Sequence, residues 1–235
     1  MLLAQALKVS VMTTARFKLY AFWRTSATYR VRVALNLKGL EAEEQFVDND
    51  KGENRSEGFL KINPLGGLPV MLDREGGSPE TALTQSLAIL EYLEEVVPRP
   101  AILPADPMGR ARVRSIASML AADTHPLITP RIRRYLTETG GFDADQWRAW
   151  QTQWFTTGLQ ALETRLAADP ETGVFCHGDA ITMADICLAS IIVVMRVFGI
   201  EVADIPTVDR IMKACEGSEA FAAADPRRQV GAPTG

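Results

Sequence analysis

A cluster of three hydroxyl side chains, Thr25, Ser26 and Thr28, stands where an aromatic-rich segment passes into a helical pattern. Serine and threonine are favoured at the start of a helix, because their side-chain oxygen accepts a hydrogen bond from a free backbone N–H group. The same hydroxyl can instead donate a hydrogen bond to a thiolate, and the helix dipole adds to that stabilisation. Lowering a thiol pKa from about 8.5 by about two units needs only about 2.7 kcal/mol of preferential stabilisation of the thiolate. The cluster therefore predicts either helix capping or thiol activation.

Two other short segments have features that can bind a peptide-like ligand. Ser86 follows Gln85 at the expected start of a helix, where it serves either as a cap or as part of an anion site. Leu68 and Pro69 open an expected strand after a turn that contains two glycines. A cis peptide bond before Pro69 would turn the Leu68 N–H and C=O groups outward, where an extended peptide can pair with them; otherwise the pair is an ordinary turn.

The cysteines and histidines form no metal or disulfide pattern. The three cysteines, at 176, 187 and 215, are odd in number, widely spaced and without a CxxC motif, which favours a reducing compartment. The two histidines, at 125 and 177, are too few for a multi-histidine metal site. We therefore expect no metal, and we interpret Cys176 and Cys187 as small core residues.

The composition is that of a globular protein, with 47% apolar and 23% charged residues among 235. The formal net charge of −4 provides no electrostatic attraction for nucleic acid or an anionic membrane surface. The basic clusters Arg110–Arg114 and Arg131–Arg134 lie in helical patterns and are interpreted as solvated faces. The most apolar stretch, Ile186–Met195, is too short to span a membrane. Lys8 interrupts the apolar start of the chain, so we interpret residues 1–16 as an extension and not as an export signal.

Hydrophobic periodicity divides the chain into an α/β half and an all-α half. The first half predicts strands at 17–22, 43–47, 68–72 and 80–83, with helices at 29–40 and 84–97. The second half predicts helices at 108–137, 143–168, 182–198, 206–215 and 218–224. The expected units are an extension (1–16), an α/β domain (17–97), a proline-rich linker (98–107), an all-α domain (108–228) and a tail (229–235). Thr182 and Asp185 have the spacing of a capping box.

Several of these segments together resemble the glutathione S-transferase family. The resemblance lies in RTSATYRVR, NPLGGLPV and TQSLAILEYLEE, and continues through ILPADP, HPL and GDAITMADICLA. The RTSATYRVR and HPL segments are similar to the zeta class, which includes maleylacetoacetate isomerase. The resemblance covers about residues 17–228. It implies a thioredoxin-like N-terminal domain with the order β-α-β-α-β-β-α, followed by an all-helical C-terminal domain.

The resemblance also assigns roles to residues. It implies that the γ-glutamyl end of glutathione meets Gln85 and Ser86, and that the glutathione cysteine pairs with Leu68 beside a cis Pro69. The expected partners are glutathione as co-substrate and a small electrophile. The resemblance further implies a homodimer in the cytoplasm.

The chain departs from the family pattern in the loop that activates the thiol. The zeta class usually has Ser-Ser-Cys there, whereas this chain has Thr25, Ser26 and Ala27. Counting back from Arg30 puts Thr25 in the place of the usual serine, so Thr25 is the first candidate for the thiolate partner. Ser26 is the second candidate, because it lies closer to the first helical turn, where capping would occupy it.

Two residues are expected in the substrate pocket. His125 belongs to the His-Pro-Leu segment, which the resemblance places near the cleft between the domains, and its alternative role is that of a structural histidine. Arg196 lies one position away from an arginine that zeta isomerases carry late in a helix.

Two functions remain open. In one, the protein is a glutathione-dependent enzyme of the zeta type, in which thiolate adds to an electrophilic carbon. Release of the thiol after bond rotation gives isomerisation, and retention gives a conjugate. In the other, the protein is a non-catalytic binding or interaction module, which the altered loop permits.

Overall fold

The computed structural model describes residues 15–76 and 81–233. A mixed four-stranded sheet has the order β2-β1-β3-β4, with β1 parallel to β2 and antiparallel to β3. Its strands are β1 Phe17–Ala21, β2 Ala42–Phe46, β3 Val70–Asp73 and β4 Ala82–Thr84. Residues 1–14 of the predicted extension and residue 80 of the predicted fourth strand lie outside the described residues.

Strand β1 shows why the sheet has two covered faces. Its alternate residues Phe17, Leu19 and Ala21 are buried in the main core with residues of helices α1 (Ser26–Leu37) and α3 (Ser86–Val96). Tyr20 points to the other face, where it packs with Phe59 of helix α2 (Glu57–Ile62). The period of two in side-chain direction therefore assigns each strand residue to one of the two layers of helices.

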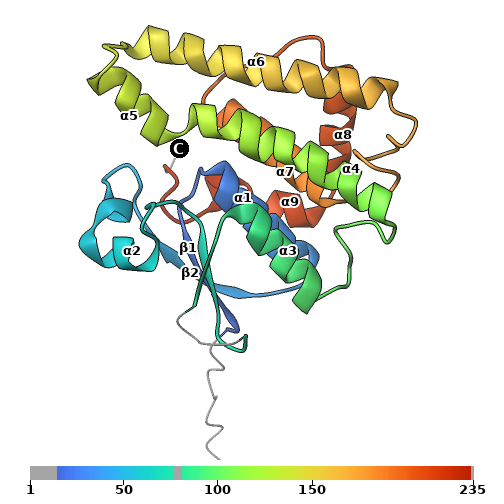
Figure 1. Cartoon of the computed structure of the whole chain (residues 1–235), viewed down its shortest axis with the longest axis horizontal. Coiled ribbons are helices and arrows are strands. Elements are labelled where there is room, and N and C mark those ends of the chain that lie inside the picture. Colours follow the sequence, from blue (N-terminus) through green and yellow to red (C-terminus); the bar gives the residue numbers. More distant parts are fainter. Residues whose placement is uncertain (1–14, 77–80, 234–235) are drawn as a thin grey trace, which may run out of the picture.

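The helices of the first half are α1 Ser26–Leu37, α2 Glu57–Ile62 and α3 Ser86–Val96. Those of the second half are α4 Pro107–Ser118, α5 Pro130–Glu138, α6 Ala144–Ala168, α7 Met183–Val197, α8 Pro206–Glu216 and α9 Glu219–Ala223. Figure 1 shows the helical half stacked on α1 and α3, with α6 outermost. This arrangement confirms the predicted fold class, a thioredoxin-like domain followed by a helical one. None of the described helices is long and apolar enough to cross a membrane.

The single helix predicted over 108–137 is wrong, because the chain turns in its middle. Helix α4 passes into a π-helical turn at Met119–Thr124 and a 3₁₀ turn at His125–Ile128 before α5 begins. Pro126 and Pro130 lack the N–H group that a continuing α-helix needs, so the regular hydrogen bonding stops here. The break directs α5 over the first half of the molecule.

Helix α7 begins at the capping box that the sequence predicts. The Asp185 carboxylate accepts hydrogen bonds from the Thr182 N–H and hydroxyl, both at 2.8 Å, and from the Cys176 N–H at 2.7 Å. Burial raises the pKa of Asp185. Cys176 and Cys187 are fully buried core residues, as predicted.

A buried ion pair ties the segment that joins the two halves. The Lys38 ammonium donates to Glu94 Oε2 at 2.8 Å and to the Val97 and Pro100 carbonyls at 2.7 and 2.9 Å. Glu94 in turn accepts from the backbone N–H groups of Ile102 and of the next residue, at 3.0 and 3.2 Å. One lysine and one glutamate thus satisfy the backbone groups of a connection that contains no helix or strand.

We expect Glu94→Gln to lower the free energy of unfolding by about 3–5 kcal/mol, because it leaves the Lys38 charge buried without its partner. Glu91→Gln is the matched control on the same helix, since Glu91 pairs with the half-exposed Arg114 and should cost about 1 kcal/mol or less. Urea denaturation of both variants measures the difference. Equal costs would show that the buried pair contributes no more than a surface pair.

Candidate functional site

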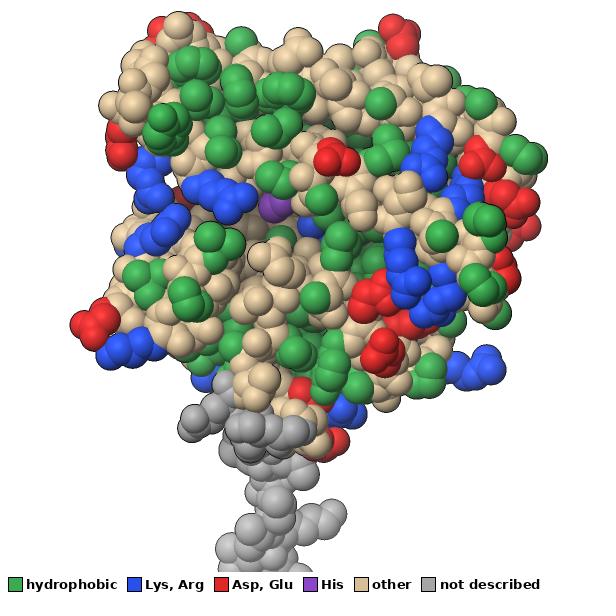
Figure 2. Space-filling model, in the orientation of Figure 1, with side chains coloured by type: hydrophobic (Ala, Val, Ile, Leu, Met, Phe, Trp, Pro, Cys, Tyr) green, Lys and Arg blue, Asp and Glu red, His purple; other side chains and the backbone are tan. Residues whose placement is uncertain are grey.

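A cavity of about 810 Å³ opens between the two halves of the molecule. It is lined by residues of the β1–α1 and β2–α2 loops, the entry to β3, the start of α3 and the broken α4–α5 segment. Figure 2 shows this hollow, with a histidine inside and lysine and arginine side chains at its edge. The four residues predicted to bind glutathione, Leu68, Pro69, Gln85 and Ser86, all line it.

The start of α3 has the geometry of an anion site. Gln85 has a φ of 67°, a left-handed conformation that is uncommon for residues other than glycine and that clusters at binding sites. Ser86 is the first residue of the helix, where backbone N–H groups lack helical acceptors. The Ser86 hydroxyl oxygen accepts a hydrogen bond from Arg30 Nη1 at 3.0 Å.

The entry to β3 brings a backbone segment to the same cavity. The Leu68–Pro69 peptide bond is cis, as the resemblance implies. The strand itself begins at Val70, so Leu68 stands just before the β3–β4 pairing and faces the cavity together with Pro69. This is the placement expected of a backbone group that pairs with an extended ligand.

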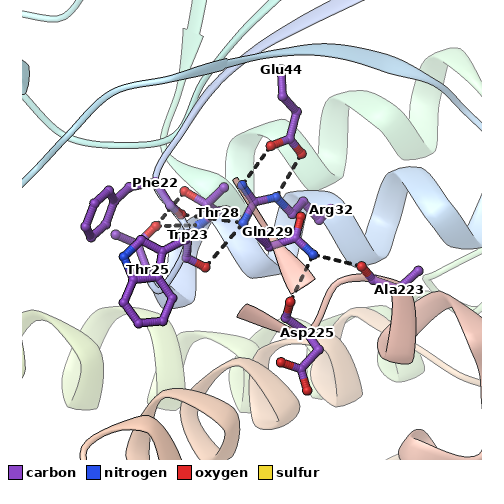
Figure 3. Close-up of polar contacts among 9 residues, drawn as sticks. All are labelled: Phe22, Trp23, Thr25, Thr28, Arg32, Glu44, Ala223, Asp225 and Gln229. Carbon is purple, nitrogen blue, oxygen red and sulfur yellow. Dashed lines mark hydrogen bonds and ion pairs between the residues drawn. The ribbon is translucent and has the colours of Figure 1, made fainter. Parts of the chain in front are cut away.

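Thr25, and not Ser26, caps helix α1. The Thr25 hydroxyl oxygen accepts from the Thr28 N–H at 3.3 Å and lies 2.5 Å from the Thr28 hydroxyl (Figure 3). The sequence-based expectation that capping occupies Ser26 is therefore wrong, because the helix already begins at Ser26, one residue earlier than that expectation requires. Thr25 also borders the large cavity, so its capping role does not remove it from the site.

Ser26 faces a second, smaller cavity of about 100 Å³ that adjoins the first at Thr25. Its side chain is buried, and its hydroxyl finds no hydrogen-bond partner within the described part of the chain. The walls of this cavity include Phe22, Trp147 and Phe198. These aromatic walls stand beside polar side chains of the same cavity, among them Arg133, so the smaller cavity is suited to a ligand with both apolar and anionic parts.

Arg32 holds the loop that carries these hydroxyls. Its guanidinium makes a two-pronged ion pair with Glu44 at 2.7 and 2.8 Å, and its Nη1 lies 3.4–3.5 Å from the carbonyls of Phe22 and Trp23 (Figure 3). The same view shows Gln229, which bonds back to carbonyls at the end of α9 and beyond it. Residues 234–235 of the predicted tail lie outside the described residues.

His125 lines both cavities, in agreement with its predicted place near the cleft. Burial, with smaller contributions from the positive charges of Arg30 and Arg131, lowers the pKa of His125 to about 3. The imidazole is therefore neutral at neutral pH. It can offer one N–H donor and one nitrogen acceptor to a ligand, but no charge.

The structure does not bring Arg196 to the cleft. Val194 and Phe198, four residues apart, line the smaller cavity, whereas Arg196 is half exposed and pairs with Glu216 of α8. Two residues of helix rotate a side chain by about 200°, so the face that carries Arg196 is turned away from the cavity.

The basic residues of the cavity were missed by the sequence analysis. Arg131, Arg133 and Arg134 are exposed, as a solvated face requires, but this face also borders the two cavities, Arg131 and Arg134 the larger one and Arg133 the smaller one. Lys51 and Arg55 line the larger cavity from the opposite side. Their runs of charge were visible in the sequence, but only the packing of the two halves makes them neighbours.

Comparisons with known proteins agree with this architecture. Residues 15–95 match the family model of the glutathione S-transferase N-terminal domain. A maleylpyruvate isomerase of Ralstonia sp. is 38% identical, with 90% of this chain and 98% of that protein covered. The maleylacetoacetate isomerase of Rhizobium meliloti is 40% identical, with 89% and 96% covered.

Two solved structures are similar over nearly their whole length. A maleylacetoacetate isomerase from Methylobacterium extorquens AM1, with bound malonate and glutathione, is 47% identical with a TM-score of 0.88, covering 92% of this chain and all of that one. A holo maleylpyruvate isomerase, a bacterial transferase in the zeta class, is 38% identical with a TM-score of 0.86 and the same coverage. The chain belongs to the zeta class of the glutathione S-transferase family.

In this zeta-class transferase the cavity contains one acidic and five basic side chains. The acidic one, Asp50, accepts from Arg24 at 2.6 Å and is thereby neutralised. The cavity therefore has a positive field that favours anionic ligands. No group of three or more metal-ligating side chains occurs within the described ranges 15–76 and 81–233.

We expect His125 to make the protein sensitive to acid. Its pKa in the folded protein, about 3, lies below the value of 6.5 for an unfolded chain, so its contribution to stability is complete above pH 6.5 and is lost as the pH falls toward 3. Against His125→Gln, the wild-type free energy of unfolding should fall more steeply, by up to about 1.4 kcal/mol per pH unit.

Urea denaturation at intervals between pH 8 and pH 4 measures this difference. Above pH 7 the two curves should run parallel, because both side chains are neutral there, and this range is the internal control. Curves that stay parallel down to pH 4 would contradict the neutral state of His125.

Proposed function

We propose that this protein is a glutathione-dependent cis–trans isomerase of small maleyl-type dicarboxylic acids. The observation that carries the proposal is the cationic cavity next to the hydroxyl cluster at the start of α1. A neutral electrophile would gain nothing from five basic side chains, whereas a dicarboxylate would. The relatives named maleylacetoacetate or maleylpyruvate isomerase support this reaction. So does a related structure that holds dicarboxyethyl glutathione and citrate in its active site.

When bound, glutathione supplies a thiolate that adds reversibly to one carbon of the substrate double bond, so that the bond can rotate before the thiolate leaves. The residues of the cavity fit this co-substrate. The start of α3 offers Ser86 and free N–H groups to the γ-glutamyl carboxylate. Leu68, beside Pro69, offers backbone groups to the cysteinyl residue.

Thr25 is proposed as the donor to the thiolate. Of the three hydroxyls at the start of α1, it is the one that borders both cavities, so a sulfur atom at their junction lies within its reach. The Thr25 hydroxyl donates to the Thr28 hydroxyl 2.5 Å away; in the proposed complex this bond reverses, so that Thr28 donates to Thr25 and the Thr25 proton turns to the sulfur. The positive end of the α1 helix dipole also stabilises the thiolate.

Ser26 and the basic side chains are proposed to act on the acid substrate. Ser26 lines the smaller cavity and its buried hydroxyl has no partner within the described part of the chain, so it is free to donate to a substrate oxygen there. Arg131 and Arg133 can hold carboxylates, because guanidinium groups bind them through paired hydrogen bonds. Addition of a thiolate moves negative charge onto the substrate oxygens, and fixed positive charges stabilise that charge more than they stabilise the ground state.

We also propose a cytoplasmic location and a homodimer. The three cysteines are all free and buried, which supports a reducing compartment. The dimer is implied by the family resemblance, and light scattering on the purified protein tests it.

We expect Thr25→Ala to raise the pKa of the bound glutathione thiol by about 1–2 units, because a hydrogen bond to a charged group contributes about 1.5–3 kcal/mol. The ultraviolet absorbance of the thiolate at neutral pH measures this, and glutathione affinity should stay nearly unchanged. Thr25→Ser is the matched control, since it keeps both the donor and the helix cap. Ser26→Ala should have the smaller effect on the thiol. The reverse ranking would transfer the role to Ser26.

We expect the protein to isomerise maleylacetone at saturating glutathione, with a kcat/KM that falls as ionic strength rises, because salt screens the cationic cavity. Turnover of a neutral aryl halide in the same buffers is the control and should depend on salt far less. Aryl halide turnover without maleylacetone turnover would identify a general transferase. Glutathione binding without turnover of either compound would identify a non-catalytic module.

A further inference from the structure

Arg30 brings a positive charge into the interior beneath the proposed glutathione site. It lies in α1, is 1% exposed, and lines the larger cavity. Its Nε donates to the Ser190 hydroxyl of α7 at 2.8 Å, and its Nη1 donates to the Ser86 hydroxyl of α3 at 3.0 Å. Its Nη2 is buried and has no hydrogen-bond partner within the described ranges of the chain.

No carboxylate pairs with this guanidinium among the described residues. Two titratable neighbours interact electrostatically with Arg30, and neither carries a negative charge at neutral pH. One is Cys187, because burial raises the pKa of its thiol to about 11, and the other is the neutral His125. A buried charge without a counter-charge is costly, and burial lowers the pKa of Arg30 itself. An anion bound in the cavity is the partner that this arrangement lacks.

The contact with Ser86 shows where that anion lies. A guanidinium has only donors, so the Ser86 oxygen must be the acceptor and its hydroxyl proton must point away from Arg30. Ser86 is also the first residue of α3, where free N–H groups and the helix dipole attract negative charge. The Ser86 hydroxyl is thus held as a donor toward the cavity.

We propose that Arg30 is a positioning residue for the α-carboxylate of the γ-glutamyl group. It orients the Ser86 hydroxyl so that this group donates toward the cavity. Its positive charge, which lies beneath Ser86, compensates the negative charge of the carboxylate. The proposal rests on the glutathione site proposed above. Because Ser190 of the helical half anchors the guanidinium, the carboxylate site depends on both halves of the molecule.

The test compares two ligands that differ in this carboxylate alone: glutathione and 4-aminobutyryl-cysteinyl-glycine, which lacks it. Titration calorimetry measures both affinities. We expect Arg30→Met to weaken glutathione binding about 10- to 100-fold, the range for one hydrogen bond to a charged group, and to change analogue binding less than about 2-fold. The kinetic counterpart is a raised KM for glutathione with the pKa of the bound thiol unchanged.

Arg32→Met is the matched control, because Arg32 is a buried arginine of the same helix that pairs with Glu44. It should lower stability without changing the affinity ratio between the two ligands. If Arg30→Met does not fold, Ser190→Ala keeps the arginine and removes one anchor, and it should reduce the affinity ratio about 2- to 10-fold. In a Ser86→Ala background the effect of Arg30→Met on the ratio should shrink, because the two residues act as one unit.

Equal losses for both ligands in Arg30→Met, or an unchanged ratio in both Arg30→Met and Ser190→Ala, would overturn this role and leave the glutathione site intact. A wild-type protein that binds glutathione and the analogue equally would overturn it as well. Failure of the wild type to bind glutathione at all would instead overturn the proposed function, and with it this role.

Discussion

Helix α1 is buried between the sheet domain and the helical domain, and the rest of the site depends on that burial. Nine of its twelve residues are buried, and it packs against α3 on one side and against α7 and α9 on the other. Two arginines of α1, Arg30 and Arg32, are buried together with it. Arg32 finds a carboxylate in Glu44 and carbonyls in the loop before Thr25. Arg30 finds only the hydroxyls of Ser86 and Ser190. Both contacts fix the ends of elements that face the cavity.

The cavity is built from places where regular structure begins or stops. Thr25 caps α1, Ser86 opens α3, Pro69 precedes β3, and His125 lies in the irregular turn after α4. At such places backbone N–H or C=O groups have no partner in their own element and remain available to a ligand. The prolines that interrupt α4 also redirect α5, and its residues Arg131 and Arg134 line the same cavity as the β2–α2 loop. One break in a helix thus supplies both a neutral imidazole and a cationic wall.

The net charge of the whole molecule is opposite in sign to the charge of the cavity. The chain has a net charge of −4, whereas the cavity is positive. The fields of individual charges act within about 10 Å at ordinary ionic strength, so the local arrangement determines which ligand is attracted. The neutral His125 fits this pattern, because a half-buried imidazole among arginines loses its proton.

The sequence by itself determined the two-domain order, the α7 capping box and the placement of Gln85 and Ser86 at a helix start, because these depend on period and local capping, whereas the cis Pro69 was implied only by the family resemblance. It also marked Thr25 and Ser26, although it gave the capping role to the wrong one. Only the tertiary structure decided which arginines belong to the site. Arg196 lies on the helix face turned away from the cavity, whereas Arg131 lies on the cavity wall and Arg30 lies beneath Ser86. The physical reason is that each residue along a helix turns the direction of the side chain by about 100°. The packing of a helix, and not the types of its residues, therefore decides which charged side chains face the cavity.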